Sequence, residues 1–125
     1  MSQVDDIRLG SSALSELSHA MVRLYKDRFG RGPTRARSSW VGDHAVICIL
    51  EDTLTSAERT LQELGEYERL RDLRMVFQYS LEAEFKTMAE RIFDRPVQAF
   101  VSGLDAATGI ATEVFLFASD PALET

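Results

Sequence analysis

The sequence lacks the features that build internal disulfides and membrane spans. Its only cysteine is Cys48, so the chain cannot form an internal disulfide. No window approaches the ~18 consecutive apolar residues that a transmembrane helix needs. A secretory signal pattern is also missing, because the first ten residues carry acids in place of bases and no apolar segment follows them. We therefore expect a cytoplasmic protein that does not itself span a membrane.

The sequence also lacks a surplus of positive charge. Lysines and arginines number 14 against 20 acidic residues, which gives a formal net charge of −6. Nucleic-acid binding draws most of its affinity from counterions released by a basic surface. We therefore expect no nucleic-acid partner.

The composition predicts one globular domain. Of the 125 residues, 45% are hydrophobic and 27% are charged, which is ordinary for a chain long enough to bury a core. No stretch rich in proline, glycine and serine divides the chain. We expect a single domain over residues 11–118, with flexible tails at 1–10 and 119–125.

A helical pattern runs from Ser11 to Phe29. Gly30 and Gly32 favour a helix end there, and Pro33 cannot continue a helix. Apolar residues recur at three- and four-residue spacing along this segment, at Leu14, Leu17, Met21, Leu24 and Phe29.

Two hairpins are predicted. Residues 34–41 and 45–51 read as strands around a short turn, and the second of them is apolar on both faces, which places it inside a sheet. Residues 97–102 and 110–118 read as a second pair around a longer turn.

Alternation along these strands predicts what each face carries. Arg35 and Arg37 project from one side of the first strand. In the last strand, Phe115 and Phe117 fall on the side that helices on the other face would leave open. We expect a second copy of the chain to cover that aromatic surface, and so a homodimer.

The middle of the chain predicts a short helix and a long one. Thr55 and Glu58 have capping-box spacing at the start of the short helix, which Gly65 ends. The long helix covers residues 66–94, before Pro96. Its apolar stripe is Tyr67, Leu70, Leu73, Phe77, Leu81, Phe85, Met88 and Ile92. The fold class is thus α+β, with a four-stranded, mainly antiparallel sheet of two hairpins and, on one face, two longer helices and one short helix.

The most polarised feature is a basic stretch within residues 26–37. Five bases against Asp27 give it a local charge of +4, while 9 bases against 19 acids leave −10 on the other 113 residues. The basic residues are Lys26, Arg28, Arg31, Arg35 and Arg37, and the residues that shape the loop are Gly30, Gly32 and Pro33.

Three interpretations of this stretch are open. Bases in a last helical turn followed by glycine and proline form an ordinary helix stop. Alternatively, Arg31, Arg35 and Arg37 can form a side-chain fork for phosphate, carboxylate or bicarbonate. A third possibility is a docking patch for an acidic protein surface or for anionic lipid.

No catalytic or metal-binding pattern accompanies it. His19 and His44 have no ligand at metal spacing, and Cys48 lies in an apolar strand, where a buried thiol is inert. Asp43 precedes His44 without a serine elbow. We expect no enzyme activity, no metal and no cofactor.

Several segments together resemble a known family. They are MVRLYKDRFGRGPTRAR, VICILEDTLTSAERTL, MVFQYSLEAEFKTMAERIFDRPVQAFVSG and IATEVFLF. With its box Gly30-Arg31-Gly32-Pro33-Thr34, the chain resembles, over about residues 12–118, the MpsC-type family of small bacterial proteins, formerly a domain of unknown function. Residues 40–44 and 104–109, at the two hairpin turns, depart from the family pattern.

The resemblance implies association with a sodium-translocating, membrane-potential-generating system whose membrane subunits are similar to cation-pumping antiporters and inorganic-carbon uptake components. It attaches no catalytic residues to the fold. We therefore expect a non-enzymatic accessory or regulatory protein, which docks through its basic loop onto an acidic partner such as the cytoplasmic side of a membrane ion-translocating complex. A small-anion or nucleotide sensor is the alternative.

Overall fold

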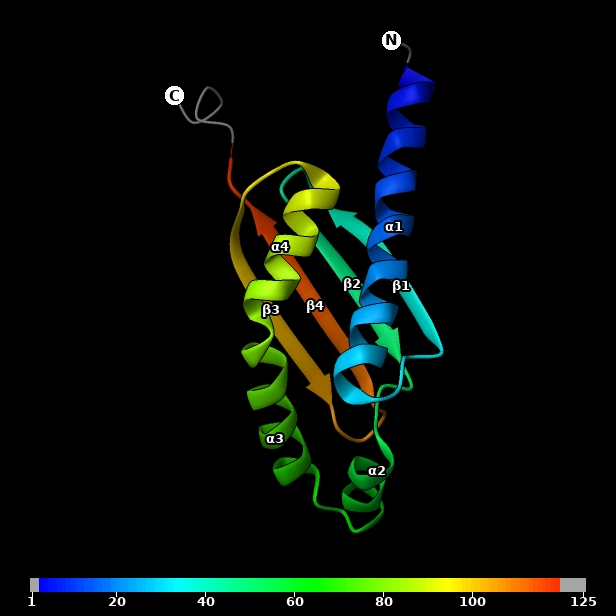
Figure 1. Cartoon of the computed structure of the whole chain (residues 1–125), viewed down its shortest axis with the longest axis vertical. Coiled ribbons are helices and arrows are strands. Elements are labelled where there is room, and N and C mark those ends of the chain that lie inside the picture. Colours follow the sequence, from blue (N-terminus) through cyan, green and yellow to red (C-terminus); the bar gives the residue numbers. More distant parts are fainter. Residues whose placement is uncertain (1–2, 120–125) are drawn as a thin grey trace.

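The computed structural model describes the backbone of residues 3–119 and the side chains of residues 12–119 (Figure 1). The elements follow in the order α1 (Gln3–Phe29), β1 (Arg35–Val41), β2 (Ala45–Glu51), α2 (Ser56–Glu63), α3 (Tyr67–Ser80), α4 (Glu82–Phe93), β3 (Val97–Asp105) and β4 (Ile110–Phe117).

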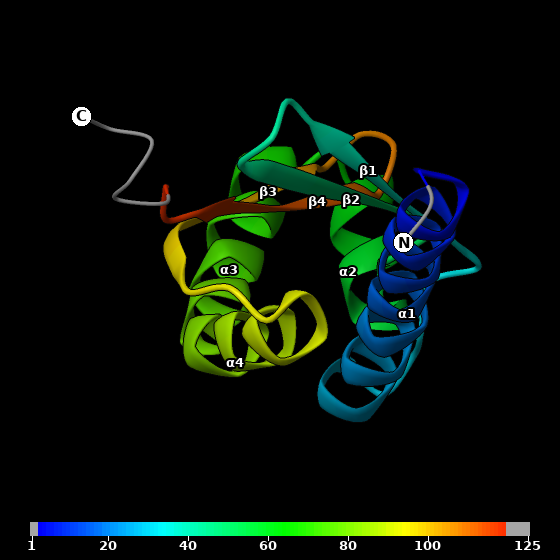
Figure 2. The same ribbon diagram turned by 90° about the horizontal axis from the view of Figure 1, so that it is seen from above.

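The strands form one antiparallel sheet in the order β1-β2-β4-β3. Each hairpin contributes an edge strand and an inner strand, and the two hairpins join where β2 pairs with β4. Figure 2 shows the helices on one side of the sheet. The predicted α+β class and the two hairpins are confirmed, whereas the described residues contain four helices in place of the predicted three.

Helix α1 ends where the sequence predicts and begins earlier. Gly30 follows it at φ 79° and donates its N–H to the Lys26 carbonyl at 3.0 Å, which closes the last turn. The helix begins at Gln3, whereas the apolar pattern predicts Ser11. The parts of the predicted flexible tails at 1–2 and 120–125 lie outside the described residues.

The capping box of α2 is present as predicted. Glu58 donates its backbone N–H to Thr55 Oγ1 at 3.3 Å, and Thr55 donates its own N–H to Glu58 Oε1 at 2.8 Å. Two N–H groups that the first helical turn leaves without backbone partners are thereby satisfied. Gly65, at φ 75°, follows the helix end.

The predicted long helix is divided at Leu81 into α3 and α4. In a continuous helix the Leu81 N–H would donate to the Phe77 carbonyl. Instead it donates to the Gln78 carbonyl at 3.2 Å, and the Ser80 hydroxyl donates to the Phe77 carbonyl at 2.6 Å. A serine hydroxyl that bonds a carbonyl of the preceding turn competes with the backbone ladder and favours a bend in the helix. Figure 1 shows α4 inclined to α3 beyond this point.

The apolar stripe predicted for this region is mostly wrong in α3, where only Leu70 of the stripe is buried, and mostly right in α4. Leu73 and Phe77 are 46% and 49% exposed, while Arg74 and Gln78 are fully buried in their place. In α4, Phe85 and Met88 are buried as predicted, and Ile92 packs against the core. Polar side chains of α3 therefore lie within the core, between the layer of helices and the sheet.

The prediction for the faces of β4 is also wrong. Phe115 and Phe117 lie beneath the helices, where Phe115 packs on Phe100 and Phe117 on Phe93 with ring centroids 5.4 and 5.3 Å apart. Large rings fill the space between helices and sheet, so they set which face is covered. The open face carries Thr112, Val114 and Leu116 instead.

Candidate functional site: a groove between α1 and α4

A groove of about 480 Å³ lies between helices α1 and α4, on the helical side of the sheet. The groove forms between these helices because α1 packs on the edge strand β1, while α3 and α4 pack on the opposite edge strand β3. Side chains that reach inward cover the inner strands, among them Met21 and Phe85, both fully buried. The volume falls within the range of ligand sites in proteins.

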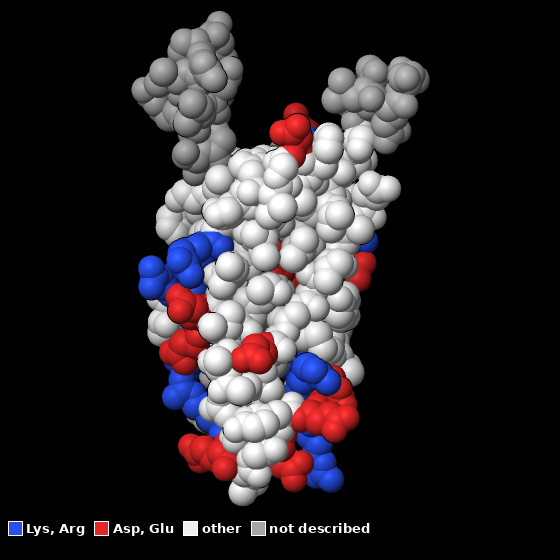
Figure 3. All heavy atoms as spheres, turned by 180° about the vertical axis from the view of Figure 1, so that it is seen from behind, with Lys and Arg blue, Asp and Glu red and all other residues white. Residues whose placement is uncertain are grey.

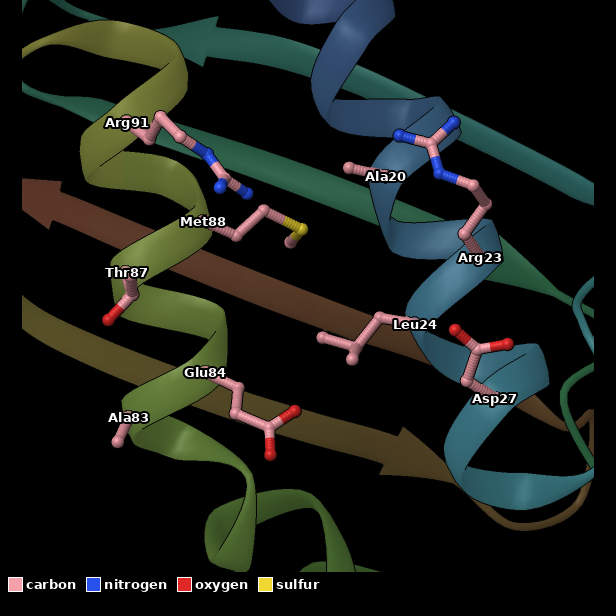
Figure 4. A pocket seen from close by; sticks show the side chains of 9 residues that line it. All are labelled: Ala20, Arg23, Leu24, Asp27, Ala83, Glu84, Thr87, Met88 and Arg91. Atoms are coloured by element: carbon pink, nitrogen blue, oxygen red, sulfur yellow. The ribbon is translucent and has the colours of Figure 1, made fainter.

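The floor of the groove is apolar. Ala20 and Leu24 come from α1 and Met88 comes from α4, and Figure 4 shows Leu24 and Met88 extending toward the space between the helices. A methionine side chain has three flexible torsions, so it can adapt its shape to an apolar partner.

The two rims carry opposite charges at opposite ends (Figure 4). Arg23 and Arg91 lie at one end, and Asp27 and Glu84 lie at the other. The antiparallel course of α1 and α4 produces this separation, since Arg23 precedes Asp27 by one turn while Glu84 precedes Arg91 by two.

The acidic end is partly neutralised within the chain. Arg28 donates from Nε and Nη2 to the two carboxylate oxygens of Glu84, at 3.1 and 2.7 Å. Within the described part of the chain, Arg23 and Arg91 form no ion pair. The groove thus offers two exposed guanidinium groups beside an apolar floor.

A buried polar cluster lies between the helices and the sheet. Glu113, fully buried on β4, accepts hydrogen bonds at Oε1 from Tyr25, Ser102 and Gln78, at 2.7, 2.8 and 3.0 Å. Burial raises the Glu113 pKa to about 8, although the bonds from Tyr25 and Ser102 and the charge of Arg74 oppose the rise. Burial, together with the Glu113 carboxylate, also holds the Tyr25 pKa well above its usual value.

Arg74 forms a second buried contact beside this cluster. It donates to Glu58 Oε1 and to the Thr53 carbonyl, each at 2.9 Å, and its guanidinium stacks 4.4 Å from the Phe29 ring centroid. These bonds tie α3 to the start of α2 and to the end of α1. The cluster is closed to substrates, and its evident role is to fix the helices that border the groove.

Three of the five predicted basic site residues have partners inside the chain. Arg28 bonds Glu84 at the groove, Arg35 lies 3.5 Å from Glu51, and Arg31 bonds Asp52.

Arg31 also donates to the carbonyls of Asp52 and Leu54, at 2.7 and 3.0 Å. The hydrogen bond from Arg31 holds the Asp52 pKa below its usual value. The nearby hollow of about 370 Å³ is lined by Glu51 and Asp52 as well as Arg35, which disfavours a small anion there.

The other predicted residues are dispersed. Lys26 and Arg37 are exposed, and neither forms an ion pair with the described residues. Gly32 leaves room for α1, because a Cβ there would stand 3.2 Å from the Val22 carbonyl oxygen. Pro33 is buried. The structure thus separates Arg37, on a strand, from Arg28, beside the groove.

Sequence reasoning missed the groove residues, although their spacing carried a signal. Arg23 and Asp27 are four apart, and Glu84 and Arg91 are seven apart, so each pair shares a helix face. That the two faces oppose each other depends on tertiary packing. The buried cluster gave no such signal, because Tyr25 and Glu113 are 88 residues apart in sequence.

Neither a metal cluster nor a membrane-spanning helix is found in the part of the chain that the structure describes. There, no group of three or more His, Cys, Asp or Glu side chains could hold a metal ion. None of its helices is both long and apolar enough to cross a bilayer.

Comparison with known proteins identifies the family. The sequence model of the family described as "Na+-translocating membrane potential-generating system (MpsC)" matches residues 11–119, nearly the whole chain. The chain belongs to this family. No curated protein and no solved structure matches it. The MpsC assignment confirms the predicted resemblance and links the fold to a sodium-translocating membrane system by name.

Proposed function

We propose that this MpsC-family protein is a non-catalytic accessory subunit of a sodium-translocating membrane system. In this proposal it binds at the cytoplasmic face, where the α1–α4 groove receives a short acidic, partly apolar segment of a membrane partner. The family description supports the system, and the groove supports the mode of binding.

The observation that carries the proposal is the pairing of an apolar floor with two exposed arginines. Ala20, Leu24 and Met88 supply the contact area, while Arg23 and Arg91 supply charge of one sign at one end. Arginine binds carboxylates with a planar fork of donors, and it is enriched at protein interfaces. An acidic side chain of the partner would meet the arginine end, and apolar side chains beside it would contact Met88.

The size of the groove limits what it can receive. Its α1 rim from Ala20 to Asp27 spans about 11 Å, at 1.5 Å per residue. That length matches two helical turns or three to four extended residues. The groove therefore fits a short linear segment and not a whole domain.

The proposal moves the docking surface away from the basic loop that the sequence indicates. Arg31 hydrogen-bonds Asp52 and Arg35 forms an ion pair with Glu51, so using them for a partner would first break internal contacts. Of the five predicted residues, Arg28 alone contacts a groove residue, through its bonds to Glu84.

Co-purification from detergent-solubilised membranes tests the proposal. The wild-type chain is expected to bring down subunits of the membrane system, and Arg23→Glu/Arg91→Glu is expected to lose them. The matched control is Arg69→Glu/Arg71→Glu, which reverses two exposed arginines of α3 outside the groove; the Arg69 side chain is 80% exposed. Equal recovery of the membrane subunits by the wild-type chain and the groove variant would refute the proposal. Stabilisation on heating by phosphate or nucleotide, lost when Arg31, Arg35 and Arg37 are replaced, would favour the small-anion alternative.

A further inference from the structure

The open face of the sheet is a second surface, on the side away from the groove. Every second residue of each strand has its side chain on this open face, and the helices cover only the other face of the sheet (Figure 2). Val41, Val101 and Leu116 are 59%, 51% and 39% exposed, which is unusual for large apolar side chains in one contiguous area. The apolar residues of this open face are Val41, Ala45, Ile47, Ile49, Ala99, Val101, Ile110, Val114 and Leu116.

The strand register arranges these residues in rows across the sheet. One row runs from Val41 through Ala45 and Leu116 to Ala99. The next runs from Ser39 through Ile47 and Val114 to Val101. Charged residues lie toward one end of the face, and Figure 3 shows a broad uncharged area bordered by acidic and basic groups.

We propose that the open face binds the open face of a second copy of this chain, forming a two-fold symmetric sandwich. Four strands spaced ~4.8 Å apart and about seven residues long give a face of roughly 400 Å². That lies within the roughly 300–600 Å² of the largest apolar patch on a typical monomer, and contacts at its rim must add to it to reach the ~600 Å² per partner of small specific interfaces. Face-to-face sheets of this kind pack about 10 Å apart.

Charge placement favours a second copy as the occupant. Arg35 and Arg37 lie on edge strand β1, and Asp105 lies on the opposite edge strand β3. Arg35 pairs with Glu51 and Asp105 pairs with Ile110, so the basic and acidic edges lie near the same end of the sheet.

The two-fold axis lies in the interface, parallel to the strands and between β2 and β4. Rotation about it brings the charged ends of the two sheets together and exchanges the positions of the two edge strands. It therefore places β1 of one copy over β3 of the other. In that register Asp105 of the second copy lies opposite Arg35, and Arg37 lies one row away, within reach of its long side chain. By symmetry the contact forms twice. At the centre, Ile47 packs over Val114 of the second copy. Asp105 Oδ2 accepts hydrogen bonds from the N–H and the hydroxyl of Thr108, within the turn between β3 and β4. The other carboxylate oxygen, Oδ1, is available to accept hydrogen bonds from an arginine of the second copy.

The surface differs from the one that the sequence predicts for a dimer. The expectation relied on exposed Phe115 and Phe117, which are buried under the helices. Aliphatic side chains of Val101, Val114 and Leu116 form the open face instead. The two copies would carry their α1–α4 grooves on opposite outer sides, so this inference does not depend on the proposed docking.

Sedimentation equilibrium at concentrations on the order of 50 µM tests the inference. The expected mass is twice the 14.0 kDa of one chain. Val101→Lys is expected to raise the dissociation constant about a hundredfold or more, since the charge enters the interface twice. The matched control, Val76→Lys, places the same change on the outer surface of α3, where Val76 is 67% exposed, and should remain dimeric.

Charge exchange tests the orientation. Arg37→Glu and Asp105→Arg should each weaken the dimer, and the double variant should recover most of the loss. Melting curves show whether each variant is folded. A single-chain mass for the folded wild-type protein would overturn the proposal. A dimer that Val101→Lys leaves intact would do the same, and a dimer that the double variant does not restore would overturn the two-fold orientation.

Discussion

Replacing the buried Glu113 by glutamine tests the polar cluster at the centre of the fold. Glutamine keeps the size of the side chain and the oxygen that accepts from Tyr25, Ser102 and Gln78, and it removes the ionisable group. The groups that face Glu113 come from four elements: Tyr25 on α1, Arg74 and Gln78 on α3, Ser102 on β3 and Cys48 on β2.

The sign of the effect follows from the raised pKa. Glu113 has a pKa of about 8 in the fold against an ordinary value of 4.5. The folded protein therefore holds a proton that the unfolded chain releases between these two values, so the wild-type free energy of unfolding falls as pH rises from 4.5 to 8. The slope from this group approaches about 1.4 kcal/mol per pH unit, and the whole loss is on the order of 5 kcal/mol.

Urea unfolding followed by the fluorescence of Trp40, the only tryptophan, measures the effect. Below pH 4.5 the variant should be within about 2 kcal/mol of wild type, because both side chains are neutral and differ only in hydrogen bonding. By pH 9 Glu113→Gln should be the more stable protein. The comparison cancels the titration of the other groups, which both proteins share. A difference in unfolding free energy that stays constant from pH 4.5 to 9 would refute the reasoning.

Three further predictions concern single contacts. Arg74→Met should lower the free energy of unfolding by about 3 kcal/mol in urea titrations, because it leaves the buried Glu58 without its ion-pair partner; an unchanged midpoint would contradict the assigned contact. Thr55→Ala should lower the free energy of unfolding by about 1 kcal/mol, because it removes the side-chain cap of α2. Thr60→Ala, on the exposed face of α2, is the control, and equal losses of unfolding free energy in the two variants would show that the cap contributes nothing. Cys48 should react with a thiol reagent only on unfolding, since burial raises its pKa to about 11, and rapid labelling of the folded protein would exclude the buried placement.

Local features of the fold could be predicted from the sequence because neighbouring residues determine them. Gly30 ends α1 through its own φ angle, and Thr55 with Glu58 caps α2 through bonds that span three residues. The hairpins followed from alternation and turn residues in the same way. The family could be identified because its pattern extends over nearly the whole chain.

The features that the sequence did not reveal depend on distant partners. The break at Leu81 accompanies a hydrogen bond from the Ser80 hydroxyl to the Phe77 carbonyl, and nothing in the spacing of the apolar residues indicates that bond. Arg74 and Gln78 are buried where Glu58, Ser102 and Glu113 accept their hydrogen bonds. The face of β4 that helices cover, and the groove beside it, likewise exist only once α1 and α4 lie on the same side of the sheet.

Photo-crosslinking from the groove tests the central claim most directly. A photoreactive amino acid placed at Thr87, an exposed residue that lines the groove, should crosslink in cells to a subunit of the sodium-translocating membrane system. The same amino acid at Thr60, exposed on α2 outside the groove, should not. Adding Arg23→Glu/Arg91→Glu should abolish the Thr87 product. Equal crosslinking from both positions, or none from Thr87 while the membrane subunits still co-purify, would contradict binding through the groove.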